Sequence, residues 1–263
     1  SSSTDPTLYS SNRTITWIVT DANSDGAGAT SSDIKQSTIE IISSSDAPVM
    51  TAGATLDYTE NETATVIDNT ITIEDDDDTH IVGGTVTISS GYLTGDVLTL
   101  TGQGDINGGI SNSSGNLTIT TTAPVTSVTL AEYELALESI TYHSTNENPT
   151  QNTPSASRTI SWLVTDANSD GAGAETSTTV TSTINITPLT DAPVVTAGGT
   201  LSYTENSSPA AIDNTITITD DDDIEMSGST VTISTGFTIG DILELSDQNG
   251  ISGVYNDSVL TIS

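Results

Sequence analysis

Two identical nine-residue stretches hold carboxylate and amide side chains at alternate positions. TDANSDGAG spans residues 20–28 and recurs at residues 165–173, 145 positions later. The oxygen-bearing side chains are Asp21, Asn23 and Asp25 in the first copy and Asp166, Asn168 and Asp170 in the second. Alternating oxygen ligands followed by a glycine open the calcium-binding loop of an EF-hand, whose twelfth position is a bidentate glutamate. Because Ser177 holds that position after Asp166, the stretches predict cation ligands in a turn that is not an EF-hand.

The repetition extends beyond these stretches at the same offset of 145 residues. RTITWIVTDANSDGAGA from Arg13 matches RTISWLVTDANSDGAGA from Arg158, and SDAPVMTAGATLDYTEN from Ser45 matches TDAPVVTAGGTLSYTEN from Thr190. IDNTITIEDDDD at residues 67–78 likewise matches IDNTITITDDDD at residues 212–223. Self-similarity at a fixed period is typical of repeated structural units, so the sequence predicts a tandem array.

The composition restricts the classes of partner and of chemistry. The chain has 36 Asp and Glu residues against three Lys and Arg residues, and its formal net charge of −33 argues against nucleic acid and favours cations. It has no cysteine, so no thiolate metal site is available. No apolar run approaches the roughly 20 residues that cross a bilayer, and we expect no membrane insertion. Without a nucleophile elbow, a phosphate-binding loop or a cysteine nucleophile, we expect that the chain is not an enzyme.

The elements that must position the carboxylates are short β-strands. In TISWLVTD the side chains of Ile160, Trp162 and Val164 fall on one face, which is the period of a half-buried strand. Similar patterns predict strands near residues 55–59, 66–73, 85–89, 97–101, 116–120, 140–143, 158–165 and 176–187. Short strands at this spacing predict an all-β fold of tandem antiparallel β-sandwiches. The stretch VTLAEYELALESI predicts one short helix, with Thr129 and Glu132 as a capping box.

Two phases of the repeat are consistent with the sequence. The proline-containing segments around Asp46 and Asp191 resemble linkers, which divides the chain into the C-terminal part of one repeat (1–45), a complete repeat (46–190) and the N-terminal part of the next (191–263). Residues 119–145 occur once, so they are the alternative linker between domains 1–118 and 146–263. We prefer the first phase because SITYHS and RTISWLV have the pattern of paired strands.

Strand direction predicts where the acidic residues gather. If the first strand of the complete repeat runs down to Glu60, the next ends at the top with the four aspartates of residues 75–78, and the strand from Arg158 delivers Asp166 to the same edge. We therefore expect two junctions, the first with Asp46, Asp75, Asp77, Asp166, Asn168 and Asp170, and the second with Glu60, Asp191, Asp220 and Asp222. Two like charges about 4 Å apart repel by roughly 4 kcal/mol at an effective dielectric constant of about 20. Calcium, which accepts six to eight oxygen ligands, is the cofactor that relieves this repulsion.

At these positions the chain resembles the bacterial cadherin-like repeats of very large, calcium-dependent surface adhesins that are secreted with RTX-type tails. The similarity is carried by Glu60 and Glu205 in TEN, by the D-x-D pairs Asp75 with Asp77 and Asp220 with Asp222, by Asp21 and Asp166 before the last strand, and by Asp46 and Asp191 before the linker proline. The resemblance implies cadherin-like or immunoglobulin-like sandwiches, calcium at the junctions, and an extracellular location at the bacterial cell surface or after secretion.

The expected function is that of a structural spacer in a long adhesin or surface fibre. Its partners would be neighbouring repeats of the same chain, while other parts of the protein contact a cell, a matrix or a glycan. Two alternatives remain: a carbohydrate-binding cadherin-like module, or a subunit of an S-layer or sheath. Trp17 and Trp162 are expected to be core residues and not stacking platforms for sugars, because they lie at the inward positions of strands.

Overall fold

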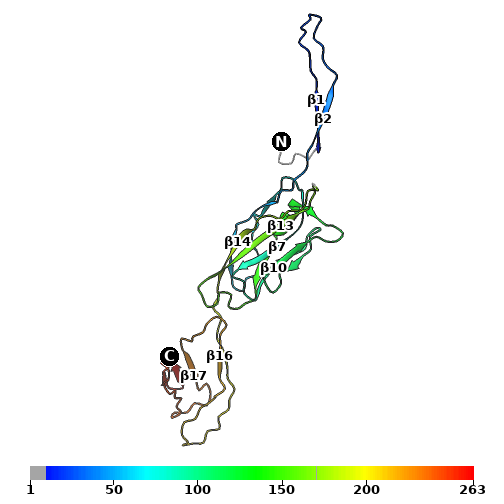
Figure 1. The fold of residues 1–263 in the computed structure, drawn as a ribbon. Coiled ribbons are helices and arrows are strands. Elements are labelled where there is room, and N and C mark those ends of the chain that lie inside the picture. Colours follow the sequence, from blue (N-terminus) through cyan, green and yellow to red (C-terminus); the bar gives the residue numbers. More distant parts are fainter. Residues whose placement is uncertain (1–9, 170) are drawn as a thin grey trace. The chain divides into compact units, whose positions relative to one another are not determined.

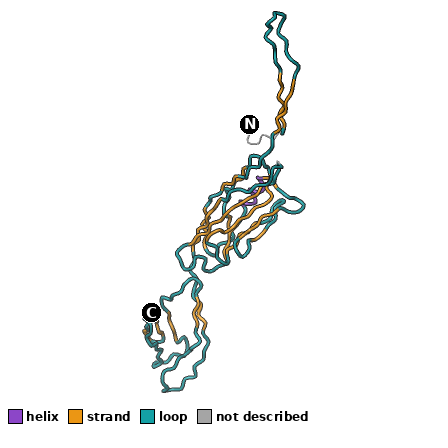
Figure 2. Tube along the Cα trace, viewed as in Figure 1, coloured by secondary structure: helices purple, strands orange, loops and turns teal. Residues whose placement is uncertain are grey.

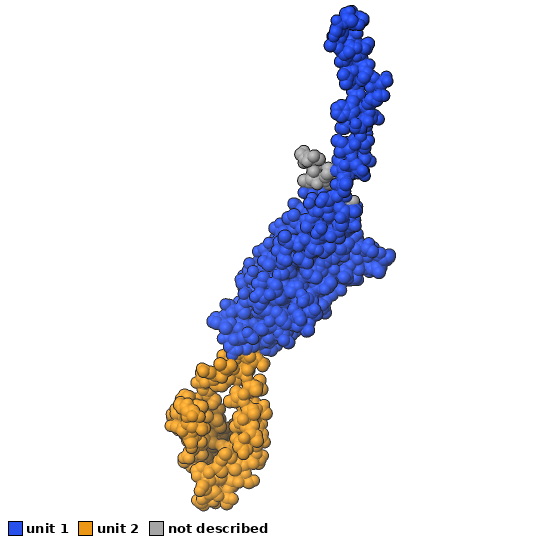
Figure 3. Space-filling view, in the orientation of Figure 1, with its two compact units in different colours: residues 1–189 blue, residues 190–263 orange. Residues whose placement is uncertain are grey.

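The computed structural model describes residues 10–169 and 171–263. The chain divides into two compact units, residues 1–189 and 190–263 (Figure 3). Figure 2 shows that strands and loops make up most of both units and that one short helix lies in the first. The fold is therefore all-β, as the sequence predicts.

The first unit contains two main sheets. The larger one has the order β10-β7-β13-β14-β4, and β11 also pairs with β7 (Figure 1). Its strands are β4 (Thr55–Thr59), β7 (His80–Ser90), β10 (Asn116–Thr120), β11 (Val128–Thr129), β13 (Ala156–Asp166) and β14 (Val180–Thr187). The second has the order β5-β12-β8-β9, with β5 (Thr65–Val66), β8 (Asp96–Leu100), β9 (Gly109–Ile110) and β12 (Thr141–Ser144). Two short strands, β3 (Val49–Thr51) and β6 (Thr72–Glu74), form a separate antiparallel pair.

Both sheets contribute to one apolar core. On β13 the alternate residues Ile160, Trp162 and Val164 are fully buried, because the period of two turns them all to the same face. The indole N–H of Trp162 donates to Ser182 Oγ at 3.0 Å, so the one polar atom of that side chain has a partner. Tyr142 of β12 packs its ring edge-on against Tyr58 of β4, with the ring centroids 4.9 Å apart.

Helix α1 (Leu130–Glu138) covers one part of this core. Its capping box is present: Thr129 Oγ1 accepts from Glu132 N at 3.3 Å, and the Glu132 carboxylate accepts from Thr129 N at 3.0 Å. Tyr133, Ala136 and Leu137 are its buried residues. The predicted helix and cap are confirmed.

Three local details differ from the sequence prediction. β4 and β14 pair in parallel, with Thr55 opposite Thr183 and Thr59 opposite Thr187, so the sandwich is not antiparallel throughout. The predicted strand 66–73 is divided into β5 and β6 by a turn at Asp68, whose carboxylate accepts from Thr70 N at 2.9 Å. β14 begins at Val180, four residues later than predicted.

β1 (Asn12–Trp17) and β2 (Lys35–Glu40) form a two-stranded antiparallel hairpin, the two strands at the blue end of the chain in Figure 1. Asn12 lies opposite Glu40 and Trp17 opposite Lys35, which is the register of the matching residues in β13 and β14. The Trp17 side chain is 57 % exposed, so the expectation that it is a core residue is wrong for this structure, because nothing in the hairpin covers it.

The second unit has two small sheets and a sparse core. β15 (Val194–Thr196) pairs with β16 (Thr217–Thr219), and β19 (Val259–Ile262) pairs with both β17 (Ser229–Thr232) and β18 (Gly253–Asn256). Its buried apolar side chains are Leu243 and Leu260. Among residues 190–263 no segment takes the place that β13 and β14 hold in the first unit.

Candidate metal centre

Three carboxylates at one end of the first unit's sandwich share an unusual arrangement of oxygens. Asp75, Asp78 and Asp166 each have one carboxylate oxygen that accepts from the backbone and one that is buried and accepts no hydrogen bond. Asp78 and Asp166 are buried as whole residues, at 2 % and 0 % exposure. A buried acceptor without a donor is costly, so these oxygens are suited to a ligand that the protein atoms do not supply.

Local backbone geometry fixes the first two of these side chains after β6. Asp75 Oδ1 accepts from Asp77 N at 3.1 Å and from Asp78 N at 2.8 Å, the bonding of an Asx turn. This turn directs the side chain of Asp78 to the loop after β13, where Ser169 N donates to its Oδ1. Asp166 is the last residue of β13, and its Oδ1 accepts from Glu175 N at 2.9 Å.

The segment that precedes β3 is attached to the same end of the sandwich. Asp46 N donates to Asp77 Oδ2 at 3.0 Å, and Ser45 Oγ donates to Gly173 O at 2.7 Å. A hollow at this place is lined by Asp46, Ala47, Val49, Glu74, Asp75 and Asp76. The structure thus brings together Asp46, Asp75, Asp77 and Asp166, which strand direction predicts to be neighbours.

The surroundings of Asp166 oppose the negative charge of its carboxylate. Burial, followed by the charges of Asp78, Asp77 and Glu175, raises the pKa of Asp166 above its ordinary value. A raised pKa means that the folded protein disfavours the ionised form of Asp166. Carboxylate oxygens are the preferred ligands of hard cations, so the group has donor chemistry that would suit such an ion. We refer to Asp75, Asp78 and Asp166 as the carboxylate triad.

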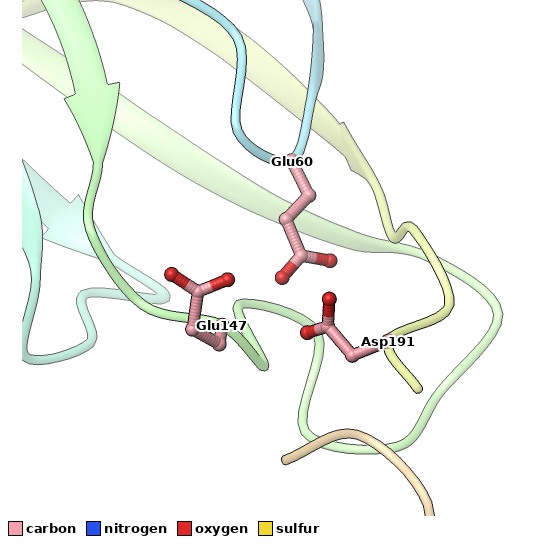
Figure 4. A group of neighbouring side chains, drawn as sticks. All are labelled: Glu60, Glu147 and Asp191. Carbon is pink, nitrogen blue, oxygen red and sulfur yellow. The ribbon is translucent and has the colours of Figure 1, made fainter. Parts of the chain in front are cut away.

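Elsewhere, two groups of three acidic side chains have oxygens close enough together to hold a metal ion. One consists of Glu60, Glu147 and Asp191, each offering an oxygen within 4.8 Å of the others (Figure 4). Glu60 is 2 % exposed, and its Oε2 accepts from Leu189 N at 2.8 Å, while Glu147 Oε2 accepts from Asn61 Nδ2 at 3.2 Å. Glu147 is not among the predicted ligands, because it lies in the loop between β12 and β13 and its counterpart at the 145-residue offset, Ser2, is not acidic.

The other group is Asp220, Asp222 and Asp223 in the second unit. Asp220 Oδ1 accepts from Asp222 N at 3.2 Å and from Asp223 N at 2.9 Å, which repeats the turn at Asp75. Asp191 N donates to Asp222 Oδ2 at 3.2 Å, as Asp46 N does to Asp77. Asp223 and its counterpart Asp78 are absent from the predicted sites, because the D-x-D pattern selects the first and third aspartates whereas the Asx turn also positions the fourth.

The remaining predicted ligands lie in the two identical stretches. Asp21 Oδ1 accepts from Asn23 N and Thr30 N, and its Oδ2 accepts from Thr30 Oγ1 at 2.6 Å, so both oxygens have partners. Asp25 Oδ1 accepts from Ala27 N at 3.0 Å. The three-residue acidic groups found among the described residues include neither aspartate.

Asn23 and Asn168 have the same structural role in their loops. The side-chain oxygen of each accepts from the glycine five residues later, at 2.5 Å from Gly28 N and at 2.7 Å from Gly173 N. Each asparagine also has a positive φ, which closes the loop. Asp170 lies outside the described residues.

Comparisons with known proteins assign no family. No protein-family model matches the chain, and a search of curated proteins found no match. No helix in the described part of the chain has both the length and the apolar character needed to cross a membrane.

Proposed function

We propose that the chain is a spacer segment of a long extracellular fibre or adhesin, and that calcium bound at the ends of its sandwiches stiffens it. The observation that carries the proposal is the carboxylate triad, with its three buried oxygens that accept no hydrogen bond. Catalysis would need an acid or base exposed to a substrate, whereas these oxygens point into a crowded acidic end that suits an ion.

The triad would hold calcium together with ligands from the segment that enters the sandwich. Asp75, Asp78 and Asp166 would each supply their second oxygen, and Asp77 and Asp46 lie beside them. Without an ion, repulsion among these charges favours movement of residues 45–48 away from the end of the sandwich. With an ion, the segment and the sandwich share a ligand set, so the connection becomes rigid.

Calcium is the cation that fits this donor set best. The ligands are carboxylates with no His or Cys among them, and calcium tolerates irregular geometry at such sites. Extracellular modules commonly bind calcium with dissociation constants of about 0.1 to 1 mM. Tenfold excess over the dissociation constant stabilises the folded state by about 1.4 kcal/mol per site.

The test compares the full chain in calcium and in EDTA. We expect calcium to raise the melting temperature and to lengthen the particle in small-angle scattering. The double variant Asp75→Asn with Asp166→Asn should lose most of both responses. The matched control is Asp21→Asn with Asp25→Asn, which removes the same charge from the exposed copy of the stretch and should respond as the parent does.

Two results would contradict the proposal. The first is a parent chain whose melting temperature and maximum dimension are the same in both buffers. The second is an equal loss of response in the control and in the triad variant, which would mean that calcium acts through net charge and not through a site.

A further inference from the structure

Several asparagines of the chain begin the tripeptide Asn-x-Ser/Thr, which is the acceptor sequence for N-linked glycosylation. They are Asn12, Asn61, Asn112, Asn116, Asn185, Asn206 and Asn256. In a chain this rich in Ser and Thr the tripeptide also arises by chance, so the sequence alone does not select an acceptor. A transferase must reach the side-chain nitrogen of the asparagine and the hydroxyl two residues later, and this requirement separates the candidates.

Two of these asparagines are held in strands of the larger sheet. Asn116 is the first residue of β10; its Oδ1 accepts from Thr87 Oγ1, and the middle residue of its tripeptide, Leu117, is buried. Asn185 lies in β14, where its Nδ2 donates to Asp57 Oδ1 at 2.9 Å and the middle residue of its tripeptide is also buried. An enzyme cannot enclose a tripeptide whose backbone is paired and whose middle side chain lies in the core, so neither asparagine is a suitable acceptor.

Asn61 lies in a turn, but its side-chain nitrogen is engaged. Asn61 Nδ2 donates to Glu147 Oε2 at 3.2 Å. The middle residue of its tripeptide is also held, because the Glu62 carboxylate accepts from Thr59 N at 2.8 Å and Glu62 O accepts from Tyr58 Oη at 2.8 Å. A transferase would have to break these contacts before the tripeptide could enter its active site.

Asn112 has its side-chain oxygen fixed and its side-chain nitrogen free. Asn112, Ser113 and Ser114 are exposed and form the turn between β9 and β10. Asn112 Oδ1 accepts from Ser114 N at 2.9 Å and from Asn116 N at 3.1 Å, and Asn112 O accepts from Gly115 N at 3.0 Å. Within the described part of the chain no protein atom bonds to Asn112 Nδ2. This Asx turn therefore presents the amide nitrogen to the solvent.

The two donors to Asn112 Oδ1 favour the chemistry of glycosyl transfer. The lone pair of an amide nitrogen is delocalised towards its oxygen, so the nitrogen must lose a proton before it can attack a sugar. The negative charge that develops then lies largely on the oxygen, and N–H groups already aimed at that oxygen stabilise it. Ser114 N and Asn116 N hold these positions, so a base can remove the proton from Asn112 Nδ2 more easily in this turn than in a free side chain.

We propose that Asn112 is an N-linked glycosylation site, and that the substrate is a sugar joined through its anomeric carbon to a phosphate leaving group. A transferase supplies the base that takes the proton from Nδ2. The nitrogen attacks the anomeric carbon, the carbon–nitrogen bond forms, and the phosphate leaves with the electron pair of the carbon–oxygen bond. The transferase reads the Ser114 hydroxyl, which is exposed and makes no hydrogen bond to the residues that the structure describes.

A glycan at Asn112 would cover an open edge of the second sheet of the first unit. β9 is the last strand of that sheet, and Ile110 on this strand, two residues before Asn112, is 69 % exposed. An exposed edge strand with an apolar side chain is a place where another chain can pair. A bulky, hydrated sugar at this turn would oppose such pairing.

The test is mass spectrometry of peptides from the full chain, isolated from the cells that naturally produce it. We expect the peptide that contains Asn112 to carry the added mass of one or more sugars, and fragmentation that leaves the sugar attached should place it on Asn112. Asn61, Asn116 and Asn185 should be unmodified. One or two added sugars would indicate a soluble sugar nucleotide as the donor, whereas a uniform longer chain would indicate an oligosaccharide preassembled on a lipid phosphate.

Serine variants produced in the same cells separate recognition from folding. Ser114→Ala removes the hydroxyl but keeps the backbone N–H that donates to Asn112 Oδ1, so it should abolish the modification and leave the circular dichroism spectrum unchanged. Ser114→Thr keeps a hydroxyl and should be modified. Ser113→Ala removes the neighbouring exposed hydroxyl and is the matched control, which should be modified as the parent is.

Three results would overturn the proposal. The first is an unmodified Asn112 in the naturally produced chain, and the second is a sugar found on another asparagine in its place. The third is a modification that survives Ser114→Ala. The outcome does not depend on the cation site: Asn112 can carry a sugar in a chain that does not respond to calcium, and a chain stiffened by calcium can have an unmodified Asn112.

Discussion

Asp21 and Asp166 hold the same place in two identical nine-residue stretches, and the fold shifts their pKa values in opposite directions. Hydrogen bonds, of which the one from Thr30 Oγ1 is the strongest cause, lower the pKa of Asp21. At the position that matches Thr30 the chain has Glu175, and burial together with Asp78, Asp77 and Glu175 raises the pKa of Asp166. The same stretch is therefore a self-contained loop in one place and part of a buried acidic group in the other.

The first prediction concerns Asp166→Asn in the absence of metal. A carboxyl group whose pKa is raised by folding contributes stability below its unfolded pKa and loses it as the pH rises through the folded pKa. At pH 7 the charge of Asp166 therefore opposes folding, and its removal should raise the melting temperature in EDTA. The asparagine keeps an acceptor for Glu175 N and adds N–H donors beside Asp77 and Asp78.

The matched variant for this prediction is Asp21→Asn, at the same position of the exposed stretch. It should not raise the melting temperature, because the ionised form of Asp21 is favoured by its hydrogen bonds. A loss of stability for Asp166→Asn in EDTA would show that the charge of this residue is already compensated within the protein.

The second prediction concerns Trp162 in the core. Truncation of a large buried aromatic side chain to alanine usually costs about 3 to 5 kcal/mol, and Trp162 also donates to Ser182 Oγ. Trp162→Ala should lower the free energy of unfolding by that amount in denaturant titration. Trp17→Ala, measured in dilute solution, is the control and should cost less than about 1 kcal/mol because Trp17 is largely exposed.

The third prediction concerns acid unfolding and Asp68. Burial opposes the charge of Asp68, but hydrogen bonds from Gly53, Ser182, Ala54 and Thr70 outweigh it and lower the pKa to about 2. A lowered pKa adds stability above the unfolded pKa of 3.8 that is lost as the pH falls towards 2. Stability should therefore decline between pH 4 and pH 2.

Asp68→Asn should reduce this decline and lower stability at pH 7 by about 1 to 3 kcal/mol, because buried donors lose their acceptor. Parallel acid titrations of the parent and the variant, followed by circular dichroism, measure both effects. Identical slopes in the two proteins between pH 4 and pH 2 would assign the acid sensitivity to other carboxylates.

The fourth prediction concerns the cap of α1. Thr129→Ala removes the hydroxyl that accepts from Glu132 N and should cost about 1 kcal/mol. Thr129→Ser keeps the hydroxyl and should cost only a few tenths of that. An alanine variant as stable as the serine variant would show that α1 is held by its packed residues Tyr133 and Leu137 without help from the cap.

Several elements could be predicted because local chemistry determines them. β4 and β10 begin and end at the predicted residues, and the α1 cap follows from Thr129 and Glu132. The proximity of Asp46 to Asp77 follows from strand direction alone. In each case the signal lies within a few residues or in the alternation of strands.

Other features could not be predicted because they depend on contacts between distant segments. The parallel pairing of β4 with β14 joins residues more than a hundred positions apart, and no local period encodes it. The alternating pattern of residues 66–73 predicts one strand, but a turn at Asp68 divides it. The Asp68 carboxylate accepts from Ser182 Oγ, 114 residues away, and no local pattern encodes that contact. Glu147 joins an acidic group from a loop without strand character, where Gln151 and Asn152 have positive φ.

The parallel pairing of β4 and β14 determines how the first unit responds to a pulling force. The chain enters the larger sheet at Thr55 and leaves it at Thr187, and these residues lie at opposite ends of the paired strands. Tension that reaches the sheet through the entering and leaving segments therefore acts along the two strands in opposite directions. The pairs from Thr55–Thr183 to Thr59–Thr187 are loaded together in shear, and they must break at once instead of opening one after another.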